Sequence, residues 1–149
     1  MPDSPAYSHF EKIGPDGWDP ADLLMFDPMP ADSADAKRCR YDITMIVRYS
    51  TRKSIQPLPV VITIDDETGT LLRDTVAATL FDDNGHAVGK GAYGVSEVEI
   101  PIAAGATLSE GYQISAAPLL QREYSKGLLN VGVVMRETGT PRTRKFLKL

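Results

Sequence analysis

Residues 41–50 alternate between apolar and polar side chains over ten positions. The apolar positions of this alternation are Tyr41, Ile43, Met45, Val47 and Tyr49. The positions between them are polar, apart from Ile46. A period of two over this length is typical of an antiparallel strand that lies over a core and turns its other face to solvent. The pattern therefore predicts a sheet protein.

Seven further segments are predicted as strands because they alternate in the same way, or are short, apolar and bounded by turn residues. These segments are Tyr7–Phe10, Asp22–Asp27, Leu58–Asp65, Arg73–Phe81, Tyr93–Ile102, Gly111–Ala116 and Leu128–Glu137. Between the last two, the stretch from Pro118 to Gly127 is the one segment that predicts a helical or 3₁₀ turn. Helix is otherwise nearly absent from the expected structure.

Local signals refine this assignment at three places. Asn84-Gly85 is typical of a short hairpin turn. Within Tyr93–Ile102 the apolar positions change phase, which predicts a bulge near Ser96 or Glu97, and Pro101 indicates the edge of a sheet. The glycine-rich residues 89–94 lack the spacing of a phosphate-binding loop, so they are interpreted as a flexible turn.

Eight short strands separated by Gly, Pro and Asx turns predict an all-β fold, an antiparallel β-sandwich of immunoglobulin-like or jelly-roll type. A chain of 149 residues is sufficient for one core, so a single domain is expected over residues 1–149. Within it, residues 1–40 are expected to form acidic N-terminal strands and a loop, and residues 138–149 a basic C-terminal tail.

The net charge of −4 is unevenly distributed along the chain. Residues 1–35 carry eight acids against Lys12, and residues 121–149 carry seven basic side chains against two acidic ones. Acidic and basic ends on a solvated surface are the favoured interpretation. Nucleic acid is not an expected partner, because the basic residues form one short tail without an aromatic-interleaved face.

The sequence offers little chemistry for catalysis or for a metal. His9 and His86 lack the ligand spacing of a zinc site, and no G-x-S-x-G elbow is present. Residues 65–67 and Asp82-Asp83 are acidic, and calcium binding or glycoside hydrolysis are alternatives for them. Both groups fall in tight turns, where Asx side chains bind their own backbone, so a structural role is favoured. We expect no catalytic residue, no metal and no cofactor.

Aromatic side chains are the remaining candidates for binding. Trp18 is the single tryptophan, and with Tyr7, Phe10 and Tyr112 it is a candidate for a sugar-stacking platform or a protein-docking surface. Packing in the core is the alternative for a lone tryptophan near the end of a sandwich.

The order of several motifs suggests a family. They are GWDPADLLMFD, YDITMIVRYS, RDTVAATLFDDNGHAVGKG, EGYQISAAPLL and GLLNVGVVMRE, and together they extend over most of the chain. In this order the chain resembles the gliding-motility lipoprotein H family of Bacteroidetes. The resemblance implies a non-catalytic cell-envelope lipoprotein that acts as a protein-interaction component of gliding motility or an associated secretion machinery.

The same resemblance implies export with a leader and a lipid on an N-terminal cysteine outside the printed sequence, which holds the protein on the periplasmic side of a membrane. Other envelope proteins are the expected partners. The predicted binding residues are Trp18, which matches the family's tryptophan, Arg48 on the polar side of its strand, and Tyr112 at the start of a late strand. Packing or a solvated surface is the alternative for each.

A carbohydrate-binding β-sandwich module at the cell surface is the alternative function, with a glycan as its ligand. An exposed, concave cluster of Trp18 and tyrosines favours that alternative. Burial of Trp18 together with a flat, polar outer sheet favours protein docking.

Overall fold

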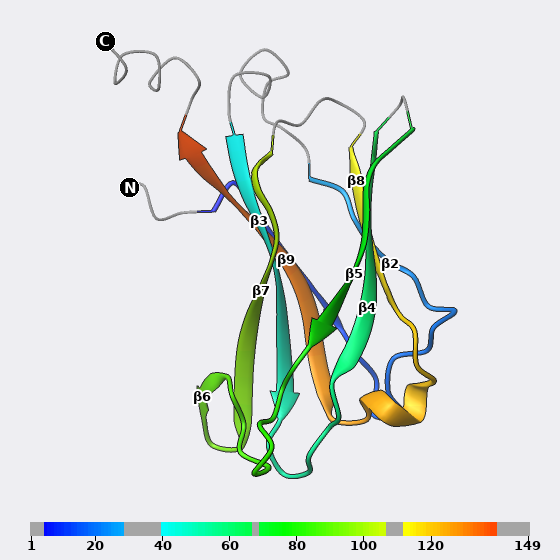
Figure 1. Cartoon of the computed structure of the whole chain (residues 1–149), viewed down its shortest axis with the longest axis vertical. Helices are drawn as coiled ribbons and strands as arrows, with labels where there is room; N and C mark the ends of the chain where they lie inside the picture. Colours follow the sequence, from blue (N-terminus) through cyan, green and yellow to red (C-terminus); the bar gives the residue numbers. More distant parts are fainter. Residues whose placement is uncertain (1–4, 29–39, 67–68, 107–111, 140–149) are drawn as a thin grey trace.

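The computed structural model describes residues 5–28, 40–66, 69–106 and 112–139. These residues form nine strands and one 3₁₀ helix: β1 (Tyr7–Lys12), β2 (Leu24–Phe26), β3 (Arg40–Ser50), β4 (Leu58–Asp66), β5 (Gly69–Ala78), β6 (Lys90–Ala92), β7 (Val95–Ala106), β8 (Gln113–Pro118), η1 (Arg122–Ser125) and β9 (Leu128–Gly139). The strands build two sheets, of order β1-β9-β3-β7-β6 and β2-β8-β4-β5, and every pairing is antiparallel. The predicted all-β sandwich is confirmed (Figure 1).

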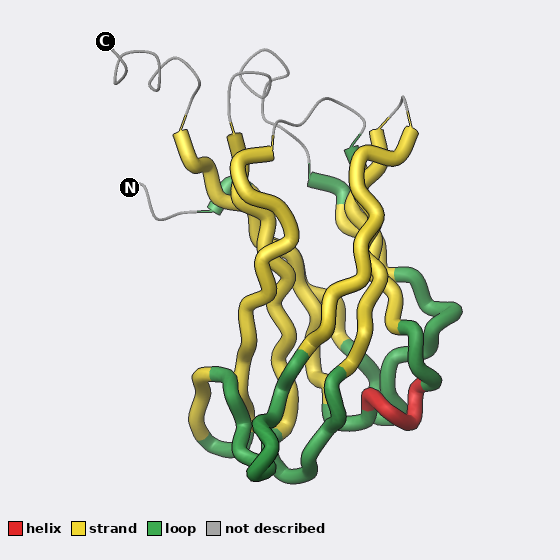
Figure 2. The backbone as a smooth tube through the Cα atoms, in the orientation of Figure 1, coloured by secondary structure: helices red, strands yellow, loops and turns green. Residues whose placement is uncertain are grey.

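The core lies between the two sheets. Its largest fully buried side chains are Trp18, Tyr49, Phe26, Ile43, Met45, Leu58, Ile62, Leu80, Ile114, Leu128, Val47 and Val60. The alternation in β3 places Ile43, Met45, Val47 and Tyr49 on the inner face, as the sequence predicts. Most connections pass from one sheet to the other, so residues distant in sequence share this core (Figure 2).

Ile46, which breaks the alternation of β3, lies on the outer face of the five-stranded sheet and is nonetheless only 8% exposed. It pairs with Gly132 of β9, and Gly132 pairs with Phe10 of β1. The Phe10 ring lies over Gly132, where a Cβ atom would collide with it. An aromatic side chain therefore covers part of this otherwise polar face beside Ile46.

All eight predicted strands are present, and β6 is a ninth that sequence reasoning missed. Tyr93 and Gly94 have φ angles of 57° and 83°, and this turn joins Ala92 to Val95. The apolar positions change phase because Tyr93 lies in the turn and not in β7. The predicted bulge at Ser96 or Glu97 is therefore wrong. The register of β7 with β3 is continuous from Val95 to Pro101, and its irregularities lie nearer the other end.

The edge indicated by Pro101 is confirmed, because β6 pairs only with Val95–Glu97 and no other described strand pairs with β7 on that side. The strand predicted over 73–81 begins and ends earlier, at Gly69 and Ala78. Residues 29–39 and 140–149, which hold much of the predicted N-terminal loop and C-terminal tail, lie outside the described residues.

The Asn84-Gly85 signal is confirmed as a turn but not as a strand hairpin. The Gly85 amide donates to the Asp82 carbonyl at 3.0 Å, and only the isolated bridge between Phe81 and Ala87 flanks the turn. Tyr49 explains why: its hydroxyl donates to the Leu80 carbonyl at 2.7 Å and accepts from the Gly89 amide at 3.1 Å. These bonds hold the connection from β5 to β6 against the sandwich.

Candidate docking surface

Trp18 lies in the connection between β1 and β2 and is only 1% exposed. Its indole Nε1 donates to the Asp22 carbonyl at 2.8 Å, and its backbone amide donates to Ser125 Oγ of η1 at 2.7 Å. Trp18 therefore packs in the core, as the alternative interpretation of the sequence expected. Its indole N–H is hydrogen-bonded within its own loop.

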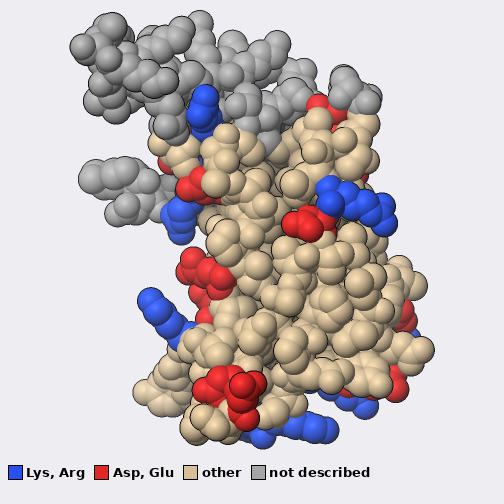
Figure 3. Space-filling view, viewed as in Figure 1, with Lys and Arg blue, Asp and Glu red and all other residues tan. Residues whose placement is uncertain are grey.

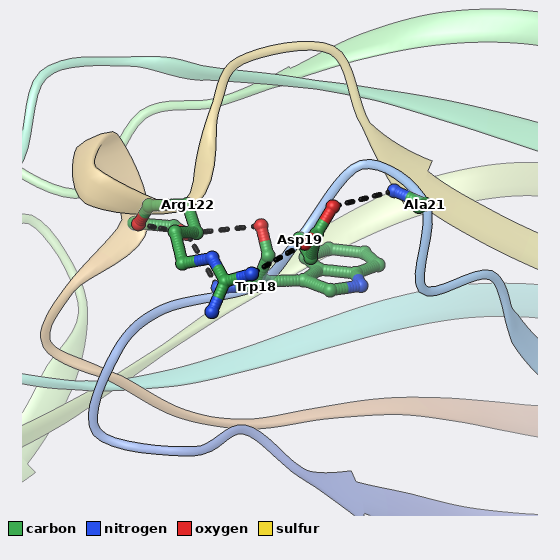
Figure 4. Close-up of polar contacts among 5 residues, drawn as sticks. Trp18, Asp19, Ala21 and Arg122 are labelled. Atoms are coloured by element: carbon green, nitrogen blue, oxygen red, sulfur yellow. Dashed lines mark hydrogen bonds and ion pairs between the residues drawn. The ribbon is translucent and has the colours of Figure 1, made fainter.

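An exposed ion pair also joins the Trp18 loop to η1. Arg122 donates from Nη2 to Asp19 Oδ2 at 2.8 Å, and Asp19 Oδ1 accepts from the Ala21 amide at 2.9 Å (Figure 4). The Ala21 amide, followed by the Arg122 charge, lowers the pKa of the Asp19 carboxyl below its usual range. The loop that carries Trp18 is thus fixed to η1 by buried and exposed contacts together.

Arg48 lies on the outer face of the five-stranded sheet, as predicted from its polar phase. Its Nε donates to Glu97 Oε1 at 2.7 Å, and its Cζ lies 4.1 Å from the centroid of the Phe10 ring. The guanidinium is thus already occupied by an ion pair and a cation–π contact. About 41% of the side chain remains exposed.

Tyr112 immediately precedes β8 and is only 4% exposed. Its hydroxyl is buried and has no hydrogen-bond partner among the described residues. Burial raises the pKa of this phenol above its usual value, and the nearby Asp66 charge adds to the shift. No hydrogen bond, ion pair or ring contact among the described residues joins any two of Trp18, Arg48 and Tyr112, so the three predicted binding residues do not form one polar site. Their binding role stays a prediction.

The remaining sequence candidates do not form a site within the described residues. The four aromatic side chains do not share one surface, since Trp18 and Tyr112 are buried and Tyr7 and Phe10 lie on opposite faces of β1. Asp82 Oδ1 accepts from the amides of Asn84 and His86, both at 2.9 Å. These amides, that of His86 first, lower the pKa of Asp82. The described residues hold no cluster of three potential metal ligands.

The outer faces of the two sheets differ in charge. On the five-stranded sheet the outward positions include the basic residues Lys12, Arg48 and Lys90 and the acidic residues Glu97 and Glu99. Figure 3 shows charged side chains of both signs scattered over the visible side, and a broad uncharged area over β4 and the lower part of β5. The central rows of the outer face of the four-stranded sheet carry mainly uncharged side chains, both polar and apolar.

Cross-strand pairing sets the composition of that second face. One row runs Met25, Ser115, Thr63 and Arg73 across β2, β8, β4 and β5. In the next row, Ala117 of β8 pairs with Val61 of β4. Arg73 is the charged side chain of these two rows.

A concavity of about 480 Å³ lies over these rows. We call it the β4–β8 pocket; its lining residues are Pro20, Leu23, Val61, Thr63, Arg73, Ser115, Ala117, Pro118 and Leu119. The floor is built from small or β-branched side chains of β4 and β8, and its rim holds Leu23 and Leu119, which are 50% and 57% exposed. Large apolar side chains exposed around a hollow are typical of an interaction site.

The connections that Trp18 secures form part of this rim. Pro20 and Leu23 belong to the Trp18 loop, and Leu119 lies between β8 and η1, where its amide donates to the Pro59 carbonyl at 3.0 Å. Sequence reasoning missed the pocket, although one signal was present. In β4 and β8 the outward positions Val61 and Ala117 are apolar, where the alternation of a solvated strand calls for polar residues.

The fold and this surface define a β-sandwich with a mostly apolar hollow on the outer face of one of its sheets. The family described as GldH lipoprotein matches residues 5–135. The chain belongs to this family, as its motifs suggested, and membership implies a lipid-anchored membrane protein. No curated protein matches the chain. Within the described residues, no helix has the length and hydropathy of a membrane span.

Two solved structures show a distant likeness. Dimeric latent PorU from Porphyromonas gingivalis is 8% identical with a TM-score of 0.33, over 90% of this chain and 13% of PorU. Eiger TNF from S. frugiperda is 11% identical with a TM-score of 0.34, over 93% of this chain and 98% of that one. The chain thus spans about an eighth of the length of PorU, and neither likeness bears on function.

Proposed function

We propose that this chain is a non-catalytic envelope lipoprotein domain that docks another envelope protein through the β4–β8 pocket, on the periplasmic side of a membrane. The machinery it serves is gliding motility or an associated secretion system. The observation that carries the proposal is the contrast between the two outer faces. One carries charged side chains of both signs, including the Arg48–Glu97 ion pair, and the other holds a mostly apolar hollow with a single cationic side chain among its lining residues.

Exposed apolar side chains give such a face its binding energy. Leu23, Leu119 and Met25 are 40–57% exposed, and each buried square ångström of apolar surface contributes roughly 25 cal/mol on association before the entropic costs. The floor lies on paired strands, so little conformational entropy is lost there when a partner binds. Both features favour a protein partner.

Two observations weigh against the alternatives. A glycan site is expected to present aromatic rings, but Trp18 and Tyr112 are buried and none of the described residues that line the pocket is aromatic. A hydrolase requires carboxylates in a cleft with a raised pKa, whereas the Asp82 carboxyl is exposed in a turn and its pKa is lowered. Partner docking is the function these features support best.

Crosslinking in intact cells tests the proposal. Full-length, natively exported protein with a C-terminal tag is crosslinked, and its partners are identified by mass spectrometry. Ala117→Trp fills the floor of the pocket, and Thr44→Trp places the same side chain on the outer face of the five-stranded sheet as a matched control. Both substitutions place an aromatic residue in a strand, where aromatic residues are well tolerated.

The expected result is recovery of envelope motility or secretion proteins with the unmodified chain and with Thr44→Trp, and their loss with Ala117→Trp. The opposite pattern places docking on the sheet that carries Arg48 and contradicts the role of the pocket. Recovery of surface polysaccharide alone, or of cytoplasmic proteins alone, contradicts protein docking in the envelope. Circular dichroism of the purified variants shows that each is folded.

A further inference from the structure

We propose that the β4–β8 pocket recognises a segment of its protein partner in which an apolar side chain stands beside a carboxylate, and that Arg73 binds this carboxylate. The inference rests on the proposed docking function and names the chemistry of the partner. Its starting point is the position of Arg73, at the end of the row that begins at Met25, with its side chain exposed at the border of the hollow.

Arg73 differs from Arg48 and Arg122 in its contacts. Arg48 pairs with Glu97 at 2.7 Å, and Arg122 pairs with Asp19 at 2.8 Å. Arg73 makes no ion pair or side-chain hydrogen bond with another described residue. Its planar guanidinium, with five donors, is therefore available, and a carboxylate is the group that accepts from two of them at once.

Carboxylates near Arg73 are used elsewhere. Asp74 follows it directly, but successive side chains of a strand point to opposite faces, and Asp74 Oδ1 accepts from the Thr75 amide at 2.9 Å. Asp65, at the end of β4, accepts from Thr70 Oγ1 at 2.7 Å. No carboxylate side chain is among the described residues that line the pocket. The charge complement of Arg73 is thus left for a partner to supply.

The hollow beside Arg73 takes the apolar part of the segment. Its floor is made by Val61, Ala117 and Thr63, whose short side chains leave room above the strands. Burying an apolar side chain there also removes water from around Arg73, which strengthens its attraction for a carboxylate. Both elements of the recognised segment therefore reinforce each other.

Two other occupants fit less well. A second copy of this chain, docked pocket to pocket, brings a second Arg73 to the hollow, and no carboxylate is among the described residues that line it. A bilayer is penetrated by protruding apolar side chains, whereas the centre of this face is hollowed and floored by small residues. A carboxylate-bearing protein segment satisfies both the shape and the charge.

Peptide selection tests the inference directly. Random linear peptides displayed on phage are selected against the unmodified chain, Arg73→Gln, Arg73→Glu and Ala117→Trp. Arg52→Glu, a charge reversal at another exposed arginine, is the matched control. Enriched peptides are synthesised, their affinities are measured by calorimetry, and their site is mapped from the amide resonances of Ser115 and Ala117.

The expected peptides contain Asp or Glu next to an apolar residue, and Arg73→Gln weakens their binding about ten- to hundredfold, the range of a lost charge-assisted hydrogen bond. Arg73→Glu is expected to reverse the selection towards Lys and Arg. Arg52→Glu is expected to change neither result. Ala117→Trp is expected to abolish binding altogether.

Failure of this inference is distinguishable from failure of the proposed function. If peptides bind at Ser115 and Ala117 without acidic preference, and Arg73→Gln leaves their affinity unchanged, docking stands and the role of Arg73 is wrong. If Ala117→Trp leaves all binding intact, the pocket itself is the wrong surface. Binding to phosphatidylglycerol vesicles but to no peptide overturns the inference in favour of a membrane surface.

Discussion

The backbone amide of Trp18 donates to Ser125 Oγ at 2.7 Å, across 107 residues of sequence. Ser125 is fully buried, and its hydroxyl in turn lies 3.1 Å from the Arg122 carbonyl, to which it donates. One serine thus connects the loop before β2 to the 3₁₀ helix after β8. Both connections contribute to or adjoin the rim of the β4–β8 pocket, so this bond contributes to the shape of the proposed docking surface.

Replacing Ser125 by alanine is expected to destabilise the fold by about 1–3 kcal/mol, because the Trp18 amide remains buried without its acceptor. Urea unfolding followed by tryptophan fluorescence measures the change. Ser54→Ala, at an exposed serine, is the control and is expected to leave the unfolding midpoint unchanged. A Ser125→Ala variant as stable as the unmodified chain contradicts the importance of this bond.

Tyr112 gives a prediction for alkaline pH. Its folded-state pKa is raised by burial, so the neutral phenol is favoured in the folded chain and ionises more readily in the unfolded one. The free energy of unfolding is unaffected by this phenol below the ordinary tyrosine pKa of about 10. It falls as the pH rises above that value, because the unfolded chain then releases the phenol proton more readily than the folded chain. Tyr112→Phe is expected to make stability fall less steeply above this pH.

At neutral pH the same variant is expected to be as stable as the unmodified chain or up to about 1 kcal/mol more stable, because it removes a buried hydroxyl that lacks a described partner. Urea unfolding across neutral and alkaline pH measures both effects as a difference between the two proteins. Equal pH dependence of the two proteins counts against the burial of the phenol.

Gly132 and Phe10 are expected to be coupled. A methyl group at Gly132 collides with the Phe10 ring, so Gly132→Ala displaces the ring and disturbs its stacking on Arg48. The expected cost is about 1–3 kcal/mol, the usual range for overpacking. In a Phe10→Ala background the same change is expected to cost nothing, and a double-mutant cycle measures the difference. Equal costs in both backgrounds contradict the contact.

Asp74 is expected to protect the edge of the four-stranded sheet, where β5 is the outermost strand. It pairs with the buried Ile62, so it occupies a position of β5 that faces the core side, and its carboxylate accepts from the Thr75 amide. Charged side chains turned inward on an edge strand discourage pairing with another chain. Asp74→Val is expected to increase self-association, measured by light scattering. Glu123→Val, which removes the same charge outside the strands, is expected to leave the chain's association state unchanged.

Sequence patterns predicted best where a strand has one buried and one solvated face. The alternation of β3 located its inner residues because the period of two directly reports burial. It failed for β6, a three-residue strand with two small residues and no apolar alternation. The end of β5 was misplaced because Leu80 and Phe81 are apolar although the strand has already ended, and they pack near Tyr49 instead of in a ladder.

The binding candidates show the same limit. Trp18 was singled out for its rarity, but composition does not reveal whether an aromatic ring faces a ligand or the core. Arg48 was placed on the solvated face correctly, but its partners Glu97 and Phe10 come from other strands. Arg73 was not predicted as a binding residue, because an arginine in an alternating strand is common and its spatial neighbours cannot be read from the sequence.

The sequence by itself determined the all-β class, most strand positions and the family, because these depend on local periodicity and on motif order along the chain. Only the tertiary structure decided that Trp18 is buried, that the two outer faces differ in charge, and that β4 and β8 floor a hollow beside Arg73. The reason is physical. A surface is assembled from strands that are distant in sequence, and its charge and shape depend on which strands pair and in which register.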